Sequence, residues 1–71
     1  MPADVETALK ASGAMQDYLD RPAYQQNDYL GWIGQAKRPQ TRDKRLQQML
    51  EELRRGGVYM KTEHPASRKP G

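Results

Sequence analysis

The stretch Tyr29-Leu-Gly-Trp-Ile-Gly-Gln-Ala-Lys-Arg-Pro-Gln-Thr-Arg-Asp-Lys-Arg-Leu46 decides the fold of this 71-residue chain. It contains the only Trp, the densest group of basic residues, and Pro39 between two helical patterns. Proline is tolerated at the start of a helix but breaks a helix interior. The stretch therefore predicts a helix, a sharp corner and a second helix.

Apolar residues on both sides of this corner recur at the i, i+3, i+4 spacing that places them on one helical face. On the first helix the face is centred on Trp32, which we expect to be the aromatic anchor of the core. The residues expected to form the core are Tyr29, Trp32, Ile33, Leu46, Met49, Leu50 and Leu53.

The same spacing predicts two shorter helices before the corner, so that the expected helices are residues 2–12, 14–19, 22–37 and 39–55. Gly13 is expected to end the first of them in the left-handed conformation. Gly31 and Gly34 lie inside the third helix, where each costs about 1 kcal/mol relative to Ala. They predict a close approach by a neighbouring helix, or else a kink.

These patterns predict an all-α fold, a small bundle of three to four helices with a flexible C-terminal tail. The expected division is a helical domain over residues 1–57 and a flexible basic tail over residues 58–71, which is rich in Pro, Ser and charge. Val58, Tyr59 and Met60 have a second interpretation, as a short apolar latch that folds back onto the core. No stretch alternates like a strand.

The chain contains no Cys, so neither a disulfide nor a thiolate metal site is available. No run approaches the roughly 20 apolar residues of a membrane-spanning helix, so no membrane insertion is expected. The N-terminus has no apolar signal core. These features predict a cytoplasmic protein.

Charge is divided unevenly along the chain. Residues 1–36 contain two basic and five acidic residues, a net charge of −3, whereas residues 37–71 contain ten basic and four acidic residues, a net charge of +6. The division indicates either two halves that attract each other in the fold or an anionic partner for the basic half.

The corner cluster is the candidate site for an anion or a partner, and its members are Lys37, Arg38, Arg42, Lys44 and Arg45. Arg42 lies one turn before Leu46, beside the apolar stripe. It is expected either to pair with a carboxylate of the acidic half or to bond backbone carbonyls at the end of the third helix; the candidate carboxylates are Asp17, Asp20 and Asp28. Because Arg binds carboxylates and phosphates equally well, the cluster has both a structural and an anion-binding interpretation.

Catalytic chemistry has little support in the sequence. His64, the only histidine, lies in the expected tail without a fixed partner, and Glu51 and Glu52 are assigned to a solvated helix face. No phosphate-binding loop or nucleophile elbow is present. We therefore expect no enzyme activity, no cofactor and no metal site. Tyr24 is open to either core packing or stacking on a ligand.

The corner also carries a family resemblance. Tyr29-Leu30-x-Trp32-Ile33, the run Ala36-Lys37-Arg38-Pro39-Gln40-Thr41-Arg42 and the following Lys44-Arg45-Leu46 resemble the signature of the YdeI/OmpD-associated (OmdA, bacteriocin-protection) family. Arg21-Pro22-Ala23-Tyr24 matches an earlier family segment. Gln40 replaces a common Glu, and Arg21 stands where a Ser or Thr often caps the third helix, so the start of that helix is expected to be looser.

The resemblance implies a stand-alone copy of the family's C-terminal helical module, linked by the family name to bacteriocin protection and stress response. It implies no catalytic residue. The first functional hypothesis is a non-enzymatic interaction module with an unknown protein partner. The alternative is a nucleic-acid-binding protein that uses residues 37–45 and the tail.

Overall fold

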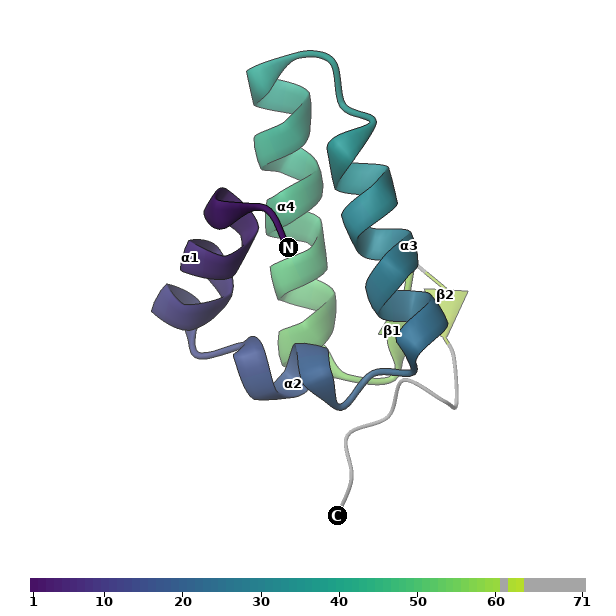
Figure 1. Ribbon diagram of the computed structural model, residues 1–71. Helices are drawn as coiled ribbons and strands as arrows, with labels where there is room; N and C mark the ends of the chain where they lie inside the picture. The colour runs from purple at the N-terminus through teal and green to yellow at the C-terminus, as the bar shows by residue number, and fades with distance from the viewer. Residues whose placement is uncertain (61, 64–71) are drawn as a thin grey trace.

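The computed structural model describes the backbone of residues 1–60 and 62–63 and the side chains of residues 1–60. Four helices account for most of this part of the chain, which confirms the predicted all-α bundle (Figure 1). The elements are α1 (Ala3–Ser12), α2 (Met15–Leu19), α3 (Ala23–Gly34), α4 (Pro39–Arg55), β1 (Val58–Tyr59) and β2 (Thr62–Glu63).

The longest helix, α4, is the centre of the bundle. It packs against α1 and α2 on one side and α3 on the other, and β1 lies against it as well (Figure 1). A helix of five residues such as α2 is too short to be stable alone in water, so its packing on α4 holds it in place.

The junction between α1 and α2 follows the prediction. Gly13 has φ 74°, in the left-handed region, and its N–H reaches the carbonyl groups of Leu9 and Lys10. Ala14 donates from its N–H to the Leu9 carbonyl at 3.0 Å. This geometry turns the chain sharply and lets α2 fold back towards α4.

The corner between α3 and α4 is longer than predicted. α4 occupies the expected range, with Pro39 in its first turn, but α3 ends at Gly34 instead of near residue 37. Arg38 is extended, with φ −107° and ψ 142°. A proline disfavours the helical conformation in the residue before it, which accounts for Arg38, and residues 35–37 complete the corner.

The core lies between α4 and the three other helices, and its buried apolar members are Val5, Leu9, Ala14, Tyr18, Tyr29, Ile33, Leu46, Met49 and Leu53. Two residues expected in it, Trp32 and Leu50, are only partly buried and pack against its edge. The prediction of Trp32 as the anchor is therefore wrong, and the fully buried Tyr29 takes that place. Tyr29 follows Gln25 and precedes Ile33 by four residues, so the buried stripe of α3 passes beside Trp32.

Gly31 and Gly34 do not mark a close helix approach. A Cβ built on either would meet nothing within 4 Å, and both residues are exposed. The expectation of close packing is therefore wrong for both positions.

The chain does not leave the bundle at residue 57. Gly56 and Gly57, each with φ 72°, turn it back, and β1 pairs with β2 in a two-residue antiparallel ladder. Tyr59 and Met60 pack against the core, which confirms the interpretation of this segment as an apolar latch, and the two short strands correct the expectation of no strand. We call Val58–Met60 the strap. The predicted flexible tail otherwise falls on residues 61 and 64–71, including His64, which lie outside the described residues.

Candidate functional site

Arg42 is tied into the fold at the corner. Its Nε donates to Asp4 Oδ2 at 2.8 Å and its Nη2 donates to Asp4 Oδ1 at 3.0 Å, while its Nη1 reaches the Ile33 carbonyl at 3.4 Å. The backbone contact at the end of α3 agrees with one predicted alternative. The predicted carboxylates were wrong, because Asp4 at the start of α1 takes the place of Asp17, Asp20 and Asp28.

Hydrogen bonding from Arg42 holds the pKa of the Asp4 carboxyl below its usual range. Asp4 is an exposed group, with 51% of its side chain accessible, so solvent screens much of the attraction. The pair therefore positions the first turns of α1 and α4 and contributes modestly to stability.

Arg45 also makes contacts that hold the corner. Its Nη1 donates to the Trp32 carbonyl at 2.6 Å, and its guanidinium carbon lies 5.3 Å from the centre of the Trp32 ring. This cation–π contact covers part of the Trp32 indole, which the core buries only partly. Arg45 therefore joins α4 to α3, one turn after Arg42.

The other three cations of the cluster, Lys37, Arg38 and Lys44, are exposed. Within residues 1–60, no side-chain hydrogen bond or ion pair is formed by any of them. We call these three residues the cationic corner. The structure therefore divides the predicted site into two arginines that hold the corner and three cations that face solvent.

A buried polar network lies at the opposite end of α3, and sequence reasoning missed it. Arg21 and Glu52 are only 5% and 4% exposed, and Gln25 is fully buried. Arg21 donates through Nη1 to Gln25 Oε1 at 3.2 Å and through Nη2 to the Glu52 carbonyl at 2.9 Å. A third bond, from Nη1 to the Val58 carbonyl at 2.8 Å, fixes the strap.

Glu52 is the acceptor at the centre of this network. The Tyr29 hydroxyl donates to Oε1 at 2.5 Å, the Met60 N–H donates to the same atom at 2.8 Å, and Gln48 donates to Oε2 at 3.0 Å. Burial, reinforced by the adjacent carboxylate, raises the pKa of the Tyr29 hydroxyl well above its usual value. The assignment of Glu52 to a solvated face is therefore wrong.

Helical spacing contained a signal for both buried charges. Arg21 extends the Gln25, Tyr29, Ile33 stripe backwards by four residues, and Glu52 lies three residues after Met49 on the inner side of α4. The start of α3, where a looser helix was expected, is held by a side chain of its own first turns. No side chain caps Pro22, but Gln26 Nε2 reaches back to the Arg21 carbonyl at 2.8 Å.

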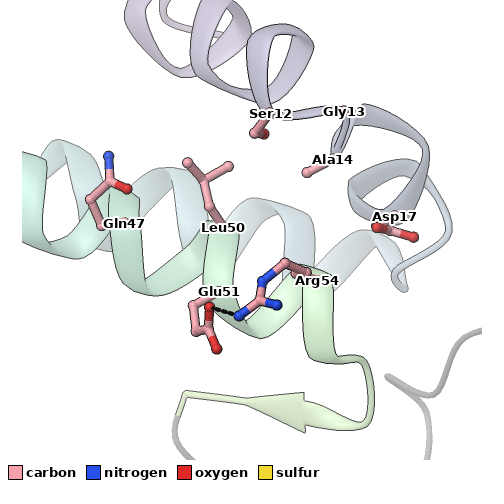
Figure 2. A pocket seen from close by; sticks show the side chains of 8 residues that line it. All are labelled: Ser12, Gly13, Ala14, Asp17, Gln47, Leu50, Glu51 and Arg54. Carbon is pink, nitrogen blue, oxygen red and sulfur yellow. Dashed lines mark hydrogen bonds and ion pairs between the residues drawn. The ribbon is translucent and has the colours of Figure 1, made fainter.

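A hollow of about 370 Å³ separates the α1–α2 junction from α4. Figure 2 shows its two walls, with Leu50 between them. The lining residues are Ser12, Gly13, Ala14, Asp17, Gln47, Leu50, Glu51 and Arg54. Arg54 pairs with Glu51 at 2.5 Å across one turn of α4, which gives the wall a neutralised charge pair.

Two further findings concern the part of the chain that the structure describes. No group of three or more His, Cys, Asp or Glu residues there is arranged to hold a metal ion. No helix there combines the length and the apolar character needed to cross a bilayer.

Comparison with known protein families places most of the chain in one family. Residues 1–56 match the family model described as "OmdA: Bacteriocin-protection, YdeI or OmpD-Associated". The matched range covers all four helices and ends before the strap. No curated protein and no solved structure matches the chain.

Proposed function

The chain belongs to the OmdA family of bacteriocin-protection, YdeI or OmpD-associated proteins, and on that premise we propose that it is a small non-enzymatic interaction module. Its setting is the cytoplasm, and its role lies in stress response or antimicrobial tolerance. The partner is a protein that presents an acidic surface to the cationic corner.

The division of the basic cluster supports this proposal. Arg42 and Arg45 join α4 to backbone carbonyl groups of α3, and Arg42 also binds Asp4 of α1, so these contacts hold the corner before any partner binds. The cationic corner, Lys37, Arg38 and Lys44, is exposed at this junction. No side chain of residues 1–60 forms an ion pair with any of its three charges. Preorganised charges of this kind raise association rates and select partners of opposite sign.

Nucleic acid is the second candidate, because the same three cations are able to contact phosphates. Binding through three phosphate contacts would give a salt dependence of about −2.7 in log K per log unit of salt. Binding of a protein partner that is recognised partly through shape and apolar contacts would depend less steeply on the salt concentration.

The test compares two triple variants with equal loss of charge. Lys37→Ala/Arg38→Ala/Lys44→Ala removes the cationic corner, while Lys10→Ala/Arg54→Ala/Arg55→Ala removes three exposed cations from elsewhere on α1 and α4. We expect only the corner variant to lose binding to a polyglutamate probe and to partners captured from the native cell extract. Nuclease treatment of the extract should leave capture intact.

Two results would contradict this function. Equal loss in both triple variants would show that net charge alone is responsible. Capture that disappears with nuclease, together with steep salt-sensitive binding to mixed RNA or DNA, would move nucleic-acid binding to first place.

A further inference from the structure

The strap contacts the bundle as a bound peptide contacts its receptor. The Val58 carbonyl accepts from Arg21 Nη1 at 2.8 Å, and the Met60 N–H donates to Glu52 Oε1 at 2.8 Å. Both contacts are to the strap backbone, two residues apart, from one donor and one acceptor held by the buried network. Any extended segment offers a carbonyl and an N–H at this spacing.

The residue between these two contacts carries the side-chain recognition. The Tyr59 ring meets the Tyr29 ring edge-on at 5.4 Å and the Tyr24 ring edge-on at 6.2 Å. Its hydroxyl donates to Asp28 Oδ2. Two aromatic walls with a carboxylate at the far end form a slot for a tyrosine side chain.

The strap itself is an imperfect occupant of this groove. Its three residues are only partly buried, and it is joined to α4 through Gly56 and Gly57. Met60, the last residue of the strap, lies in a turn with φ 50°, a left-handed conformation that a residue with a side chain adopts unfavourably. A separate segment that stayed extended at the corresponding residue would avoid that conformation.

We propose that the groove between α3 and α4, lined by Arg21, Tyr24, Asp28, Tyr29 and Glu52, is a docking site for an extended peptide segment of a partner protein. The segment carries a tyrosine followed by an apolar residue, and the chain's own strap occupies the groove until such a segment displaces it. This surface is distinct from the cationic corner, so it does not depend on the function proposed above.

The probe is a synthetic peptide with the sequence of residues 57–63, blocked at both ends and labelled with a fluorophore. The host is the full chain with Tyr59→Ala, whose own strap has lost its side-chain anchor. Binding is followed by fluorescence anisotropy. We expect the host to bind the probe at least tenfold more tightly than the unaltered chain does, because a tethered strap competes at an effective concentration in the millimolar range.

Matched controls locate the binding. Asp28→Ala in the host should weaken binding several-fold, whereas Asn27→Ala, at the adjacent exposed position of α3, should leave it unchanged. A probe with alanine in place of its tyrosine should not bind. Equal binding by the host and the unaltered chain, or equal binding of the two probes, would overturn the proposal.

A second measurement needs no variant, so it decides the question even if Tyr59→Ala does not fold. Probe peptide at several millimolar should speed hydrogen exchange of the Met60 amide in the unaltered chain, because displacement breaks its bond to Glu52. Unchanged Met60 exchange at these concentrations would overturn the proposal. A dimer of the unaltered chain with exchanged straps would also overturn it, by making a second copy the occupant.

Discussion

Arg42 and Asp4, 38 residues apart in the sequence, are joined by two hydrogen bonds of 2.8 and 3.0 Å. The contact connects the first turn of α1 to the first turn of α4 and links the acidic and basic halves of the chain. Two further ion pairs within residues 1–60, Glu6 with Lys10 and Glu51 with Arg54, lie within single helices. Within residues 1–60, the ion pair of Arg42 with Asp4 therefore joins the two halves, while Lys37, Arg38 and Lys44 remain exposed.

Glu52 should be the most sensitive charged position of the fold. Glu52→Ala leaves the buried Tyr29 hydroxyl and the Met60 N–H without their acceptor, which should lower the free energy of unfolding by about 3 kcal/mol. Glu51→Ala, one residue away on the exposed side of α4, is the matched control and should change the melting temperature little. Chemical denaturation of the three proteins measures the difference. Similar stability for both variants would show that the network contributes nothing.

Substitution of Gly31 should stabilise the fold, in contrast to substitution of Glu52. Gly31 lies in the interior of α3 in open space, so Gly31→Ala should raise the free energy of unfolding by about 1 kcal/mol through helix propensity alone. Gly13→Ala, at φ 74°, should destabilise instead, since alanine adopts that conformation unfavourably. Urea unfolding midpoints test both signs. Destabilisation by Gly31→Ala would mean that a contact absent from this structure requires glycine at position 31.

Stability should fall at high pH because of the tyrosines around the strap. Burial and the bond to Asp28 raise the pKa of Tyr59 to about 12 from its ordinary value of 10.0. A raised folded pKa means that the contribution is fully present below pH 10, where Tyr59 is neutral in both states. It is lost as the pH rises from about 10 towards 12, because the unfolded state loses its proton first.

Unfolding free energies measured between pH 8 and pH 12 test this dependence. Tyr59→Phe has no hydroxyl to ionise at that position, so its decline should be shallower than that of the unaltered chain. The raised pKa of Tyr29 leaves a residual decline in the variant. Identical slopes for the two proteins would contradict the packing of Tyr59 at the groove.

Local rules were enough to predict most of the helical framework. Gly13 and Pro39 act on their own backbone, so the α1 cap and the start of α4 could be assigned from residue type and spacing. Periodicity also identified Tyr29, Ile33, Leu46, Met49 and Leu53, which are buried. The end of α3 lies at Gly34 instead of near residue 37, and Pro39 accounts for the extended Arg38 but not for residues 35–37.

The polar interior was harder to predict, because it depends on contacts between distant segments. Arg21 reaches Glu52 and Val58 across 31 and 37 residues, so the apolar pattern of residues 58–60 indicated a returning segment but not its bond to Arg21. Trp32 was assigned to the core by its helical spacing, whereas it lies at the edge of the core, where Arg45 covers it. For the corner, spacing placed Arg42 at the apolar stripe but did not identify Asp4 as its partner.

We propose that the basic cluster contains two kinds of residue, those that hold the corner and those that bind a partner. Arg42→Lys and the triple variant Lys37→Ala/Arg38→Ala/Lys44→Ala separate them when each is measured twice, by thermal melting and by polyglutamate binding at two salt concentrations. Lysine cannot reproduce the forked contact to Asp4, so Arg42→Lys should lower the melting temperature and keep binding. The triple variant should keep the melting temperature and lose binding. An Arg42→Lys protein that melts normally but no longer binds, or a triple variant that binds as well as the unaltered chain, would contradict the claim.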